Sequence, residues 1–471
     1  MILVPTIICG GKGSRLWPAS QAHRPKPFMK IGEGGSLLQQ TFRRAAALPD
    51  VTEILTVTGQ ELHLATQHEF RQVNDRGLKT PFILEPFGRN TAAAVATAAL
   101  HCAEAHGEDA VMLILPADHL VENQQAFVEA VMAGRLAARQ GLLVAFGIDP
   151  ISAHTGYGYI EADKSSASTG SSNGWHSVRR FVEKPGPEKA EEFLQSGDYF
   201  WNSGMYCFRP GVLLQEMRQH CPAIFETASE CFRTSIAAAT SGAKFLALDY
   251  QSFSAVPNLS IDVALMEKTR NIAVVHGQFV WSDIGSWSAI AALTRKDQDG
   301  NSGSGNSFFY NSANCYVYGS ERNIGIVGLE DIVIVDSPDG LLVAHRDQAQ
   351  DVKHIYAKSE SAPQLTNGLG KTKHKPWGKS KIIESADGIL VKLLAIDPGS
   401  RISRHDPGWP VGPWFVVAGL ARVIGQNGQV TERAGGEAYH CNSRDQEILN
   451  AGEGVLTLLA IDQNAGNGLA S

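Results

Sequence analysis

Up to about residue 290, short β-branched apolar runs alternate along the chain with segments of helical periodicity. Short apolar runs of this kind predict buried strands, and the longer periodic segments predict helices. The predicted strands are 2–9, 54–58, 82–85, 111–116 and 142–148. The predicted helices are 62–73, 91–104 and 125–138, the second with Asn90 or Thr91 as its N-cap. This alternation predicts an α/β domain of the Rossmann-like, doubly wound type, in which helices cover both faces of a mostly parallel sheet.

The first predicted strand leads directly into a glycine-rich loop. Gly10, Gly11 and Gly13 allow the backbone to approach a polyphosphate closely and to present N–H groups to it. Arg15 and Lys26 add positive charge, which a phosphoryl-type transition state needs as negative charge grows on its oxygens. The loop therefore predicts a binding site for a nucleoside triphosphate.

Other glycine-loop motifs fit this loop less well. A dinucleotide-binding fingerprint would have a third glycine in place of Leu16, and a Walker loop would have Lys and then Ser or Thr in place of Ser14 and Arg15. The triplet GKT at 370–372 follows no predicted strand and has Leu365 where a Walker loop has its first glycine, so we attribute it to chance. An ordinary strand-to-helix turn is the remaining alternative for the loop after the first strand.

Two carboxylates that end or interrupt apolar runs, Asp118 in LPADH and Asp283 in VWSDIGSW, are candidate metal ligands. In a doubly wound sheet, ligands bind outside the carboxyl ends of the strands, where the glycine loop, Glu85 and Asp118 all fall. A pair of carboxylates there, together with phosphate oxygens, suits magnesium. A lone aspartate at a strand end is more often a helix N-cap, so the metal hypothesis depends on the two motifs together.

Several spaced motifs resemble those of one enzyme family. GGKGSRLWP followed by PKPF resembles the signature of the sugar-nucleotide pyrophosphorylases. LEPFGRNTAAA at 84–94, LPADH at 115–119 and FVEKP at 181–185 narrow the resemblance to the mannose-1-phosphate guanylyltransferases, of the long bacterial type with a C-terminal isomerase-like module. The resemblance covers nearly the whole chain, and Ala93, in place of a proline usual in the family, is a mild departure.

The resemblance implies that mannose 1-phosphate attacks the α-phosphorus of GTP, giving GDP-mannose and pyrophosphate, with Mg2+ as the cofactor. It implies catalytic roles for Arg15, Lys26 and Asp118, and metal binding by Asp118 and Asp283. The residues that it assigns to the nucleotide are Gly10, Gly11, Gly13, Ser14, Glu85, Arg89 and Asn90. The residues that it assigns to the sugar phosphate are Tyr157, Gly158, Glu183, Lys184 and Asn202. Taken singly, the motifs of this last group are as readily a strand bend and a turn before a helix.

After about residue 298 the helical pattern stops and short β runs follow. Polar segments at 299–306 and 358–373 are predicted linkers, which gives domains at 1–298, 305–357 and 374–471. The resemblance implies a small β-helix-like segment for the middle domain, and the β runs of the last domain indicate a jelly-roll of cupin type. The predicted strands of these two domains are 315–318, 324–327, 332–335, 341–345, 389–397, 414–423 and 454–462.

The predicted cupin departs from the family in the segment 403–414. Family members with isomerase activity have a histidine-rich segment there, which suits a metal cluster. The positions where those members have histidine or glutamate hold Pro407, Trp409, Gly412 and Pro413. Because the remaining His405 cannot supply the three or four ligands that such a site needs, we expect a cupin shell without its metal. The alternative is an unfamiliar site made by His405, Asp406 and His440.

Composition limits the partners and the location of the protein. A formal net charge of -7 over 471 residues gives no basic surface for nucleic acid. The seven cysteines are scattered and show no CxxC spacing, so they predict neither disulfides nor a zinc site, which suits a reducing cytoplasm. No apolar run approaches the length of a membrane span and the N-terminus shows no signal-peptide pattern, so we expect a soluble, cytoplasmic protein.

We expect GTP and mannose 1-phosphate as ligands, no membrane partner, and a homodimer. Two other functions stay open. One is a bifunctional enzyme that also interconverts fructose 6-phosphate and mannose 6-phosphate. The other is a non-catalytic sensor of nucleotide sugars, although a sensor would be free to lose Arg15, Lys26, Asp118 and Asp283, and all four are present.

Overall fold

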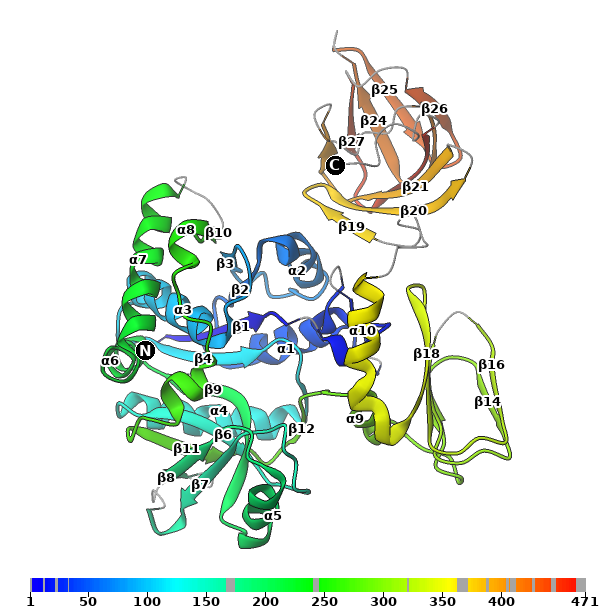
Figure 1. Cartoon of the computed structure of the whole chain (residues 1–471). Coiled ribbons are helices and arrows are strands. Elements are labelled where there is room, and N and C mark those ends of the chain that lie inside the picture. The colour runs from blue at the N-terminus through cyan, green and yellow to red at the C-terminus, as the bar shows by residue number, and fades with distance from the viewer. Residues whose placement is uncertain are drawn as a thin grey trace. The chain divides into compact units, whose positions relative to one another are not determined.

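The computed structural model in Figure 1 describes residues 2–11, 13–21, 24–32, 34–166, 174–239, 245–319, 322–361, 372–386, 389–403, 406, 412–425, 428–441 and 446–462. The chain divides into two compact units, Met1–Tyr356 and Ala357–Ser471. Among the described residues, no helix combines the length and the apolar character that crossing a membrane requires.

The first unit is built around a ten-stranded sheet with the strand order β10-β3-β2-β1-β4-β9-β6-β11-β8-β7. The five predicted strands are present as β1 (Leu3–Cys9), β2 (Leu55–Gly59), β3 (Phe82–Glu85), β4 (Val111–Pro116) and β6 (Leu143–Ile148). The others are β7 (Tyr159–Asp163), β8 (Trp175–Val182), β9 (Tyr199–Phe208), β10 (Phe245–Ala247) and β11 (Ile272–His276). All run in one direction except β8 and β9. The predicted fold class is confirmed.

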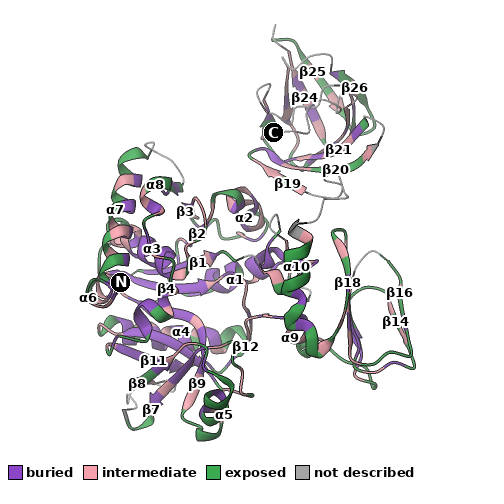
Figure 2. Ribbon diagram, viewed as in Figure 1, coloured by how far each residue is buried: buried purple, intermediate pink, exposed green. Residues whose placement is uncertain are grey.

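Helices cover both faces of this sheet, and Figure 2 shows its strands mostly buried. Along β1, Leu3 and Ile7 belong to one hydrophobic core and Val4 to the other, because successive side chains of a strand point to opposite faces. The first core includes residues of α1 (Leu37–Ala46), α2 (His63–Arg71), α4 (Gln124–Arg139) and α5 (Pro187–Ser196). The second includes residues of α3 (Asn90–His106), α6 (Pro210–His220), α7 (Pro222–Ala238) and α8 (Tyr250–Phe253).

The start of α3 differs from the prediction. Neither Asn90 nor Thr91 is the N-cap: Asn90 is the first helical residue, with a φ of 61°, and Arg89 takes the cap position without a side-chain hydrogen bond. The Asn90 side chain accepts from the N–H of Thr91 at 2.9 Å. The Thr91 hydroxyl instead accepts from the N–H of Ile261 at 2.9 Å. The Thr91 hydroxyl, a predicted helix cap, therefore makes a tertiary contact with Ile261 instead.

Short strands, most of them paired in parallel, follow the large sheet and form the β-helix-like segment, seen at the right of Figure 1. These strands are β13 (Ser302–Gly303), β14 (Ser307–Tyr310), β15 (Tyr316–Tyr318), β16 (Ile324–Val327), β17 (Ile332–Ser337) and β18 (Gly340–His345). β13, β15 and β17 pair in parallel, as do β14 and β16, while β17 and β18 form a hairpin. A shared core joins Tyr316 and Val333 of this segment to Leu16, Ile284 and Trp287, the first residue of α9 (Trp287–Leu293).

Both predicted linker segments contain regular secondary structure. The segment 299–306 contains β13, and its buried Asn301 donates to the carbonyl of Ser312 at 2.8 Å and accepts from the N–H of Cys315 at 3.0 Å. Its polar composition thus stabilises an ordered turn between strands. The helix α10 (Val352–Ser361) was not predicted and contains the first residues of the segment 358–373. Residues 362–371 lie outside the described residues.

The second unit consists of two antiparallel sheets, with the strand orders β19-β20-β21-β28-β23-β26 and β22-β27-β24-β25, as expected for a cupin-like domain. The strands of the first are β19 (Thr372–Lys375), β20 (Gly378–Ala386), β21 (Ile389–Ile396), β23 (Gly412–Ala418), β26 (Ala438–Cys441) and β28 (Leu456–Asp462). Those of the second are β22 (Arg401–Ile402), β24 (Leu420–Ile424), β25 (Val430–Ala434) and β27 (Glu447–Asn450). The predicted strand 414–423 is interrupted at Gly419, whose φ of 93° favours glycine, so its halves belong to different sheets.

Most of the residues on which the expected loss of the cupin metal site was based are not described by the structure. His405, Pro407 and Trp409 lie outside the described residues. Of the alternative ligand set, Asp406 accepts from the indole N–H of Trp377 at 2.5 Å and lies 3.8 Å from the Lys375 ammonium. Asp406 is therefore already paired within its own domain.

Candidate active site

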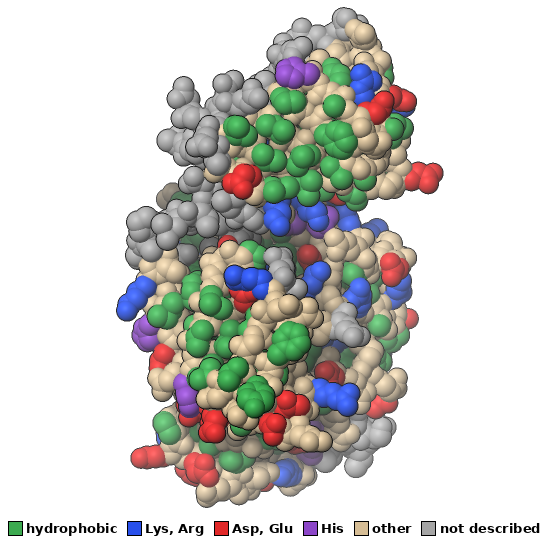
Figure 3. Space-filling view, turned by 90° about the vertical axis from the view of Figure 1, so that its right-hand side faces the viewer, with side chains coloured by type: hydrophobic (Ala, Val, Ile, Leu, Met, Phe, Trp, Pro, Cys, Tyr) green, Lys and Arg blue, Asp and Glu red, His purple; other side chains and the backbone are tan. Residues whose placement is uncertain are grey.

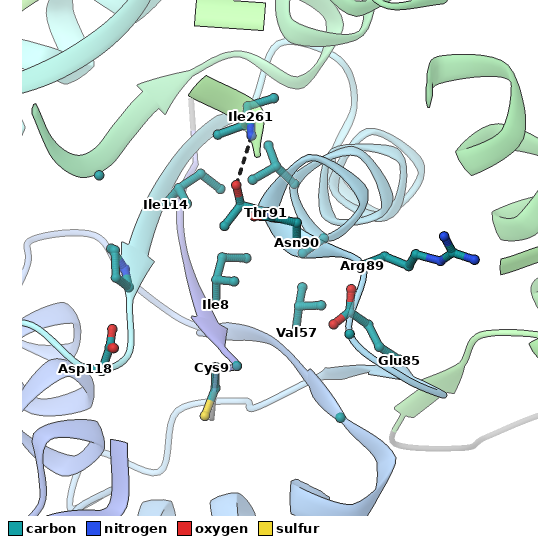
Figure 4. Close-up of a pocket in the computed structure, with 18 of the residues that line it drawn as sticks. Ile8, Cys9, Val57, Glu85, Arg89, Asn90, Thr91, Ile114, Asp118 and Ile261 are labelled. Atoms are coloured by element: carbon teal, nitrogen blue, oxygen red, sulfur yellow. Dashed lines mark hydrogen bonds between the residues drawn. The ribbon is translucent and has the colours of Figure 1, made fainter. Parts of the chain in front are cut away.

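A cavity of about 660 Å³ opens at the carboxyl ends of β1, β3 and β4 (Figure 4). This is the crevice in which doubly wound sheets bind ligands. Of the predicted site residues, Gly10, Gly11, Glu85, Arg89, Asn90 and Asp118 line the cavity. The other predicted residues, Gly13, Ser14, Arg15, Lys26, Asp283 and the sugar-phosphate group, lie outside its lining. Two of them, Lys26 and Asn202, hydrogen bond to residues of that lining.

The glycine loop is open toward the cavity on one side and closely packed on the other. Gly10 and Gly11 have no neighbouring atom within 4 Å of the position that a Cβ would take. Gly13 has a φ of 59°, and a Cβ there would lie 2.4 Å from the Ser20 hydroxyl and 2.8 Å from Cβ of Lys26. Glycine at this position therefore lets the loop pack directly against the segment that carries Lys26. Its left-handed φ also favours glycine.

Lys26 brings the two predicted metal ligands together. The residue is only 8% exposed, and its ammonium donates to a carboxylate oxygen of Asp118 at 2.8 Å and to the main-chain oxygen of Asp283. Burial alone would raise the pKa of Asp118, but the charge and hydrogen bond of Lys26 and the nearby His119 lower it below its usual value. Asp118 is therefore ionised at neutral pH.

The donors around Asp118 and Asp283 match the preference of magnesium for a few carboxylates and phosphate oxygens. Among the described residues, no group of three or more His, Cys, Asp or Glu side chains converges as a ready-made metal site. A metal ion bound by these two aspartates would therefore take its remaining ligands from a substrate or from water.

Arg15 and Ser14 lie in the short 3-10 turn Ser14–Leu16 that follows the glycine loop. The Arg15 side chain is exposed and has no hydrogen bond or ion pair with any part of the chain that the structure describes. A guanidinium with no partner among the described residues, next to a loop of open backbone, is available to an anionic ligand.

Aromatic side chains hold both aspartate segments in place. The Tyr157 hydroxyl donates to the Asp283 carboxylate at 2.8 Å, and its ring stacks on His154 with the ring centroids 3.9 Å apart. The indole N–H of Trp281 donates to Nδ1 of His119 at 3.2 Å. Tyr157, which the resemblance assigned to the sugar phosphate, thus uses its hydroxyl to orient Asp283.

Glu85 is the strongest sign that the cavity receives a polar ligand. The residue is 9% exposed, and its buried Oε1 has no hydrogen-bond partner among the described residues. Burial raises the pKa of Glu85 to about 8, and the nearby Glu61 adds to the shift. A buried acceptor without a hydrogen-bond partner destabilises the protein, so a ligand that donates to Glu85 would bind more tightly by supplying the missing hydrogen bond.

The other predicted nucleotide residues use their side chains locally. The Arg89 guanidinium lies over the Phe87 ring, 5.3 Å from its centroid, and donates to the carbonyl of Ser254. Figure 4 shows the Arg89 side chain extending away from Asp118. Together with the Asn90–Thr91 contact, these bonds shape the rim of the cavity at the start of α3.

The predicted sugar-phosphate residues form a second cluster beside the cavity. The N–H of Asn202 donates to the carbonyl of Gly158 at 2.8 Å, and a Cβ on Gly158 would lie 2.6 Å from a carboxylate oxygen of Glu183. Lys184 pairs with Glu183, and burial raises the pKa of Glu183. Asn202 also donates to Tyr206, which lines the cavity, at 2.9 Å. The structure therefore places this group together and next to the nucleotide residues.

Sequence reasoning missed several residues that line the cavity: Glu61, Thr91, His119, Tyr206, Asn258 and Asp262. Of these, His119 stood within the motif LPADH, although only its aspartate was assigned a role. Thr91 stood within LEPFGRNTAAA but was considered only as a helix cap. Asp262, a carboxylate before the apolar run VALM, gave a weak signal, and Glu61, Tyr206 and Asn258 gave none.

Three family descriptions match successive parts of the chain. The nucleotidyl transferase family matches residues 4–300, the mannose-phosphate isomerase/GMP-like beta-helix domain matches 305–358, and the mannose-6-phosphate isomerase C-terminal family matches 364–469. The chain is 37% identical over 422 residues to a mannose-1-phosphate guanylyltransferase of Klebsiella pneumoniae, covering 90% of this chain and 88% of the relative. It is 37% identical over 421 residues to the alginate biosynthesis protein AlgA of Pseudomonas aeruginosa, covering 89% and 85%. It is 37% identical over 422 residues to the xanthan biosynthesis protein XanB of Xanthomonas campestris, covering 89% and 87%.

Two solved structures resemble the fold. A mannose-1-phosphate geranyltransferase from Thermus thermophilus matches with a TM-score of 0.65 and 31% identity, over 76% of this chain and 100% of that one. A mannose-6-phosphate isomerase from Helicobacter pylori matches with a TM-score of 0.50 and 29% identity, over 59% of this chain and 99% of that one.

Proposed function

Because the chain belongs to the mannose-1-phosphate guanylyltransferase family, we propose that its cavity transfers the GMP unit of GTP to mannose 1-phosphate. The products are GDP-mannose and pyrophosphate. GDP-mannose is an activated sugar for polysaccharide synthesis, which fits the similarity to alginate and xanthan biosynthesis proteins.

One observation carries this proposal: Lys26 contacts both aspartate segments next to the glycine loop. In the reaction, a phosphate oxygen of mannose 1-phosphate forms a bond to the α-phosphorus of GTP. The bond from that phosphorus to the bridging oxygen breaks, and pyrophosphate leaves with the bonding electrons. Lys26 and Arg15 offset the negative charge that grows on the phosphoryl oxygens and on the leaving group.

Glu85 supports guanine as the base. Guanine presents two adjacent N–H donors on its Watson–Crick edge, and a carboxylate can accept from both. Adenine, by contrast, presents one donor beside an acceptor there. Glu85 lines the cavity, and its buried oxygen has no hydrogen-bond partner among the described residues. The Watson–Crick edge of guanine would supply the donors for it.

Magnesium is the cofactor that the donor set favours. Asp118 and Asp283 would hold the ion, and it would supply a Lewis-acidic charge beside the reacting phosphates. The low pKa of Asp118 keeps one of these carboxylates ionised without a bound metal.

We also propose that the protein associates as a homodimer. Phe308 and Tyr310 of β14 and Val327 of β16 are exposed, and Tyr310 and Val327 are paired neighbours across the two strands. The space-filling view from this side shows hydrophobic side chains grouped on the surface (Figure 3). Sedimentation of the wild type and of Tyr310→Asp would test this, and a monomeric wild type would contradict it.

The test of the reaction is pyrophosphate release from a panel of four nucleoside triphosphates, each paired with mannose, glucose and glucosamine 1-phosphates. We expect GTP with mannose 1-phosphate to give the highest kcat/KM. Binding of GTP and mannose 1-phosphate without any pyrophosphate release would favour a non-catalytic sensor instead.

A further inference from the structure

Asp262 occupies a fixed position at the edge of the cavity. It begins a π-helical turn, Asp262–Met266, closed by a hydrogen bond from the N–H of Glu267 to its carbonyl at 3.0 Å. The preceding residue, Ile261, donates its N–H to the Thr91 hydroxyl, and Figure 4 shows this bond beside the cavity. Single π-turns are rare and often occur at functional sites. The backbone of Asp262 is thus held to the start of α3.

The Asp262 side chain is oriented by two donors on one of its oxygens. Its Oδ1 accepts from the Asn202 amide at 2.8 Å and from the Tyr206 hydroxyl. The Asn202 amide also donates to the Tyr206 oxygen at 2.9 Å, which closes a triangle of hydrogen bonds. Within the described part of the chain, Oδ2 of Asp262 has no partner, and Asp262 lines the cavity.

This triangle changes what Asn202 can offer a substrate. An amide nitrogen has two N–H donors, and Asn202 uses them on Tyr206 and Asp262. Its amide oxygen already accepts from the N–H of Gly204 at 3.0 Å. Asn202 therefore has no donor left for a ligand, whereas Asp262 keeps a charged acceptor.

We infer that Oδ2 of Asp262 accepts a hydrogen bond from a ring hydroxyl of a bound substrate, and that Tyr206 and Asn202 are positioning residues that orient it. This inference rests on the proposed guanylyltransferase function. Two substrate hydroxyls have the required chemistry, those of the mannosyl ring and those of the nucleotide ribose. Asn202, which bonds to Asp262, also donates its N–H to the carbonyl of Gly158. A Cβ on Gly158 would lie 2.6 Å from a carboxylate oxygen of Glu183, so Asp262 lies next to the residues predicted to bind the sugar phosphate.

The experiment compares hydroxyl discrimination in the wild type, Asp262→Ala and Val263→Ala. Val263 is the exposed next residue of the same turn and serves as the matched control. For each protein, kcat/KM is measured with mannose 1-phosphate and its 2-, 3-, 4- and 6-deoxy analogues, and with GTP and its 2′- and 3′-deoxy analogues.

We expect the wild type and Val263→Ala to prefer one parent hydroxyl over its deoxy analogue by about ten- to a hundredfold, the range for a hydrogen bond to a charged group. In Asp262→Ala this one ratio should fall toward one, while the ratios for the other hydroxyls stay unchanged. A deoxy-mannose analogue as the affected substrate identifies the sugar, and a deoxy-nucleotide identifies the ribose.

Two further variants and a binding measurement keep the inference separable from protein folding and from the proposed function. Tyr206→Phe removes a positioning donor, so the same ratio should fall partly, with thermal stability measured in parallel. If Asp262→Ala does not fold, Asp262→Asn takes its place, since it keeps the shape and removes the charge. If the wild type releases no pyrophosphate, the proposed function fails, and calorimetric binding of the same analogues still tests Asp262. Ratios in the Asp262 variants equal to those of the wild type would overturn the inference.

Discussion

The indole N–H of Trp287 donates to the main-chain oxygen of Trp17 at 3.1 Å, and this bond ties the segment that carries Asp283 to the segment that carries Arg15. Trp287 is fully buried in the core that the β-helix-like segment shares with the nucleotide-binding part. Gly340 packs against the Trp17 ring, and a Cβ at this position would lie 3.1 Å from that ring. Two charged groups of the candidate active site thus depend on a core outside the cavity.

A substitution at Gly340 should therefore lower turnover without changing the cavity lining. Gly340→Leu must displace the Trp17 ring, so we expect kcat to fall by about tenfold or more, with a smaller effect on the KM for GTP. Gly325→Leu is the matched control, because no atom lies within 4 Å of its Cβ position. Equal kcat values in the two variants would show that this core does not position the site.

Lys26→Ala should cost about 3 kcal/mol of transition-state stabilisation, the scale for removing one preorganised donor or charge. The buried ammonium of Lys26 is the group that contacts both aspartate segments. The exposed Lys30 provides the control, and Lys30→Ala should keep normal kcat/KM. If Lys26→Ala lost only thermal stability and kept its turnover per folded molecule, its role would be structural.

Exhaustive chelation should abolish the formation of GDP-mannose, and added magnesium should restore it. Asp118→Ala and Asp283→Ala should each lower kcat by several orders of magnitude, because each removes a charge that the reaction needs. Undiminished activity in chelator would contradict the metal assignment. A wild-type rate in either variant would remove that aspartate from the site.

Glu85 should make both stability and GTP binding depend on pH. Its folded-state pKa of about 8 lies above the ordinary value of 4.5, so the folded protein retains a proton that the unfolded chain has lost between these pH values. The contribution of Glu85 to the free energy of unfolding therefore falls as pH rises from 4.5 to about 8. Glu85→Gln should remove this part of the slope in denaturation measured across that range.

Binding should show the opposite trend. Since two N–H donors of guanine require the ionised carboxylate, the affinity of the wild type for GTP should rise with pH up to about 8 and then level off. Calorimetric titration at several pH values measures this, with Glu85→Gln as the control that lacks the titrating group. An identical pH dependence in the variant would separate Glu85 from the base.

The C-terminal unit should have no phosphomannose isomerase activity and bind no transition metal tightly. Proline, glycine and tryptophan in the segment 403–414 supply no side-chain ligand for a metal. Truncation after Ser361, the end of α10, should leave guanylyltransferase activity. Stoichiometric metal in the full chain, with isomerase activity that His405→Ala abolishes, would contradict this reading of the sequence.

The sequence predicted the elements whose signals are local. The five buried strands and the glycine loop depend on apolar runs and on backbone freedom, both visible in short stretches. The predicted N-cap of α3 was wrong because the Thr91 hydroxyl accepts from Ile261, a residue 170 positions away. The order within the segment 299–306 was not predicted because Asn301 bonds to Ser312 and Cys315, later in the chain. Asp262 was missed for the same reason, since its role arises only where Asn202 and Tyr206 meet it.

Because β9 runs opposite to β4 and β6, the residues that it contributes to the site should evolve differently from those in the loops. The glycine loop and the segment after Glu85 follow parallel strands, and such loops tolerate insertions and deletions. Asn202 and Tyr206 instead lie within β9, whose antiparallel run brings its first half to the end of the sheet where its neighbours finish. A one-residue insertion in a paired strand moves every later side chain to the opposite face. The positions of Asn202 and Tyr206, and with them the orientation of Asp262, are therefore tied to the register of the central sheet, whereas the loops that follow the parallel strands can vary one at a time.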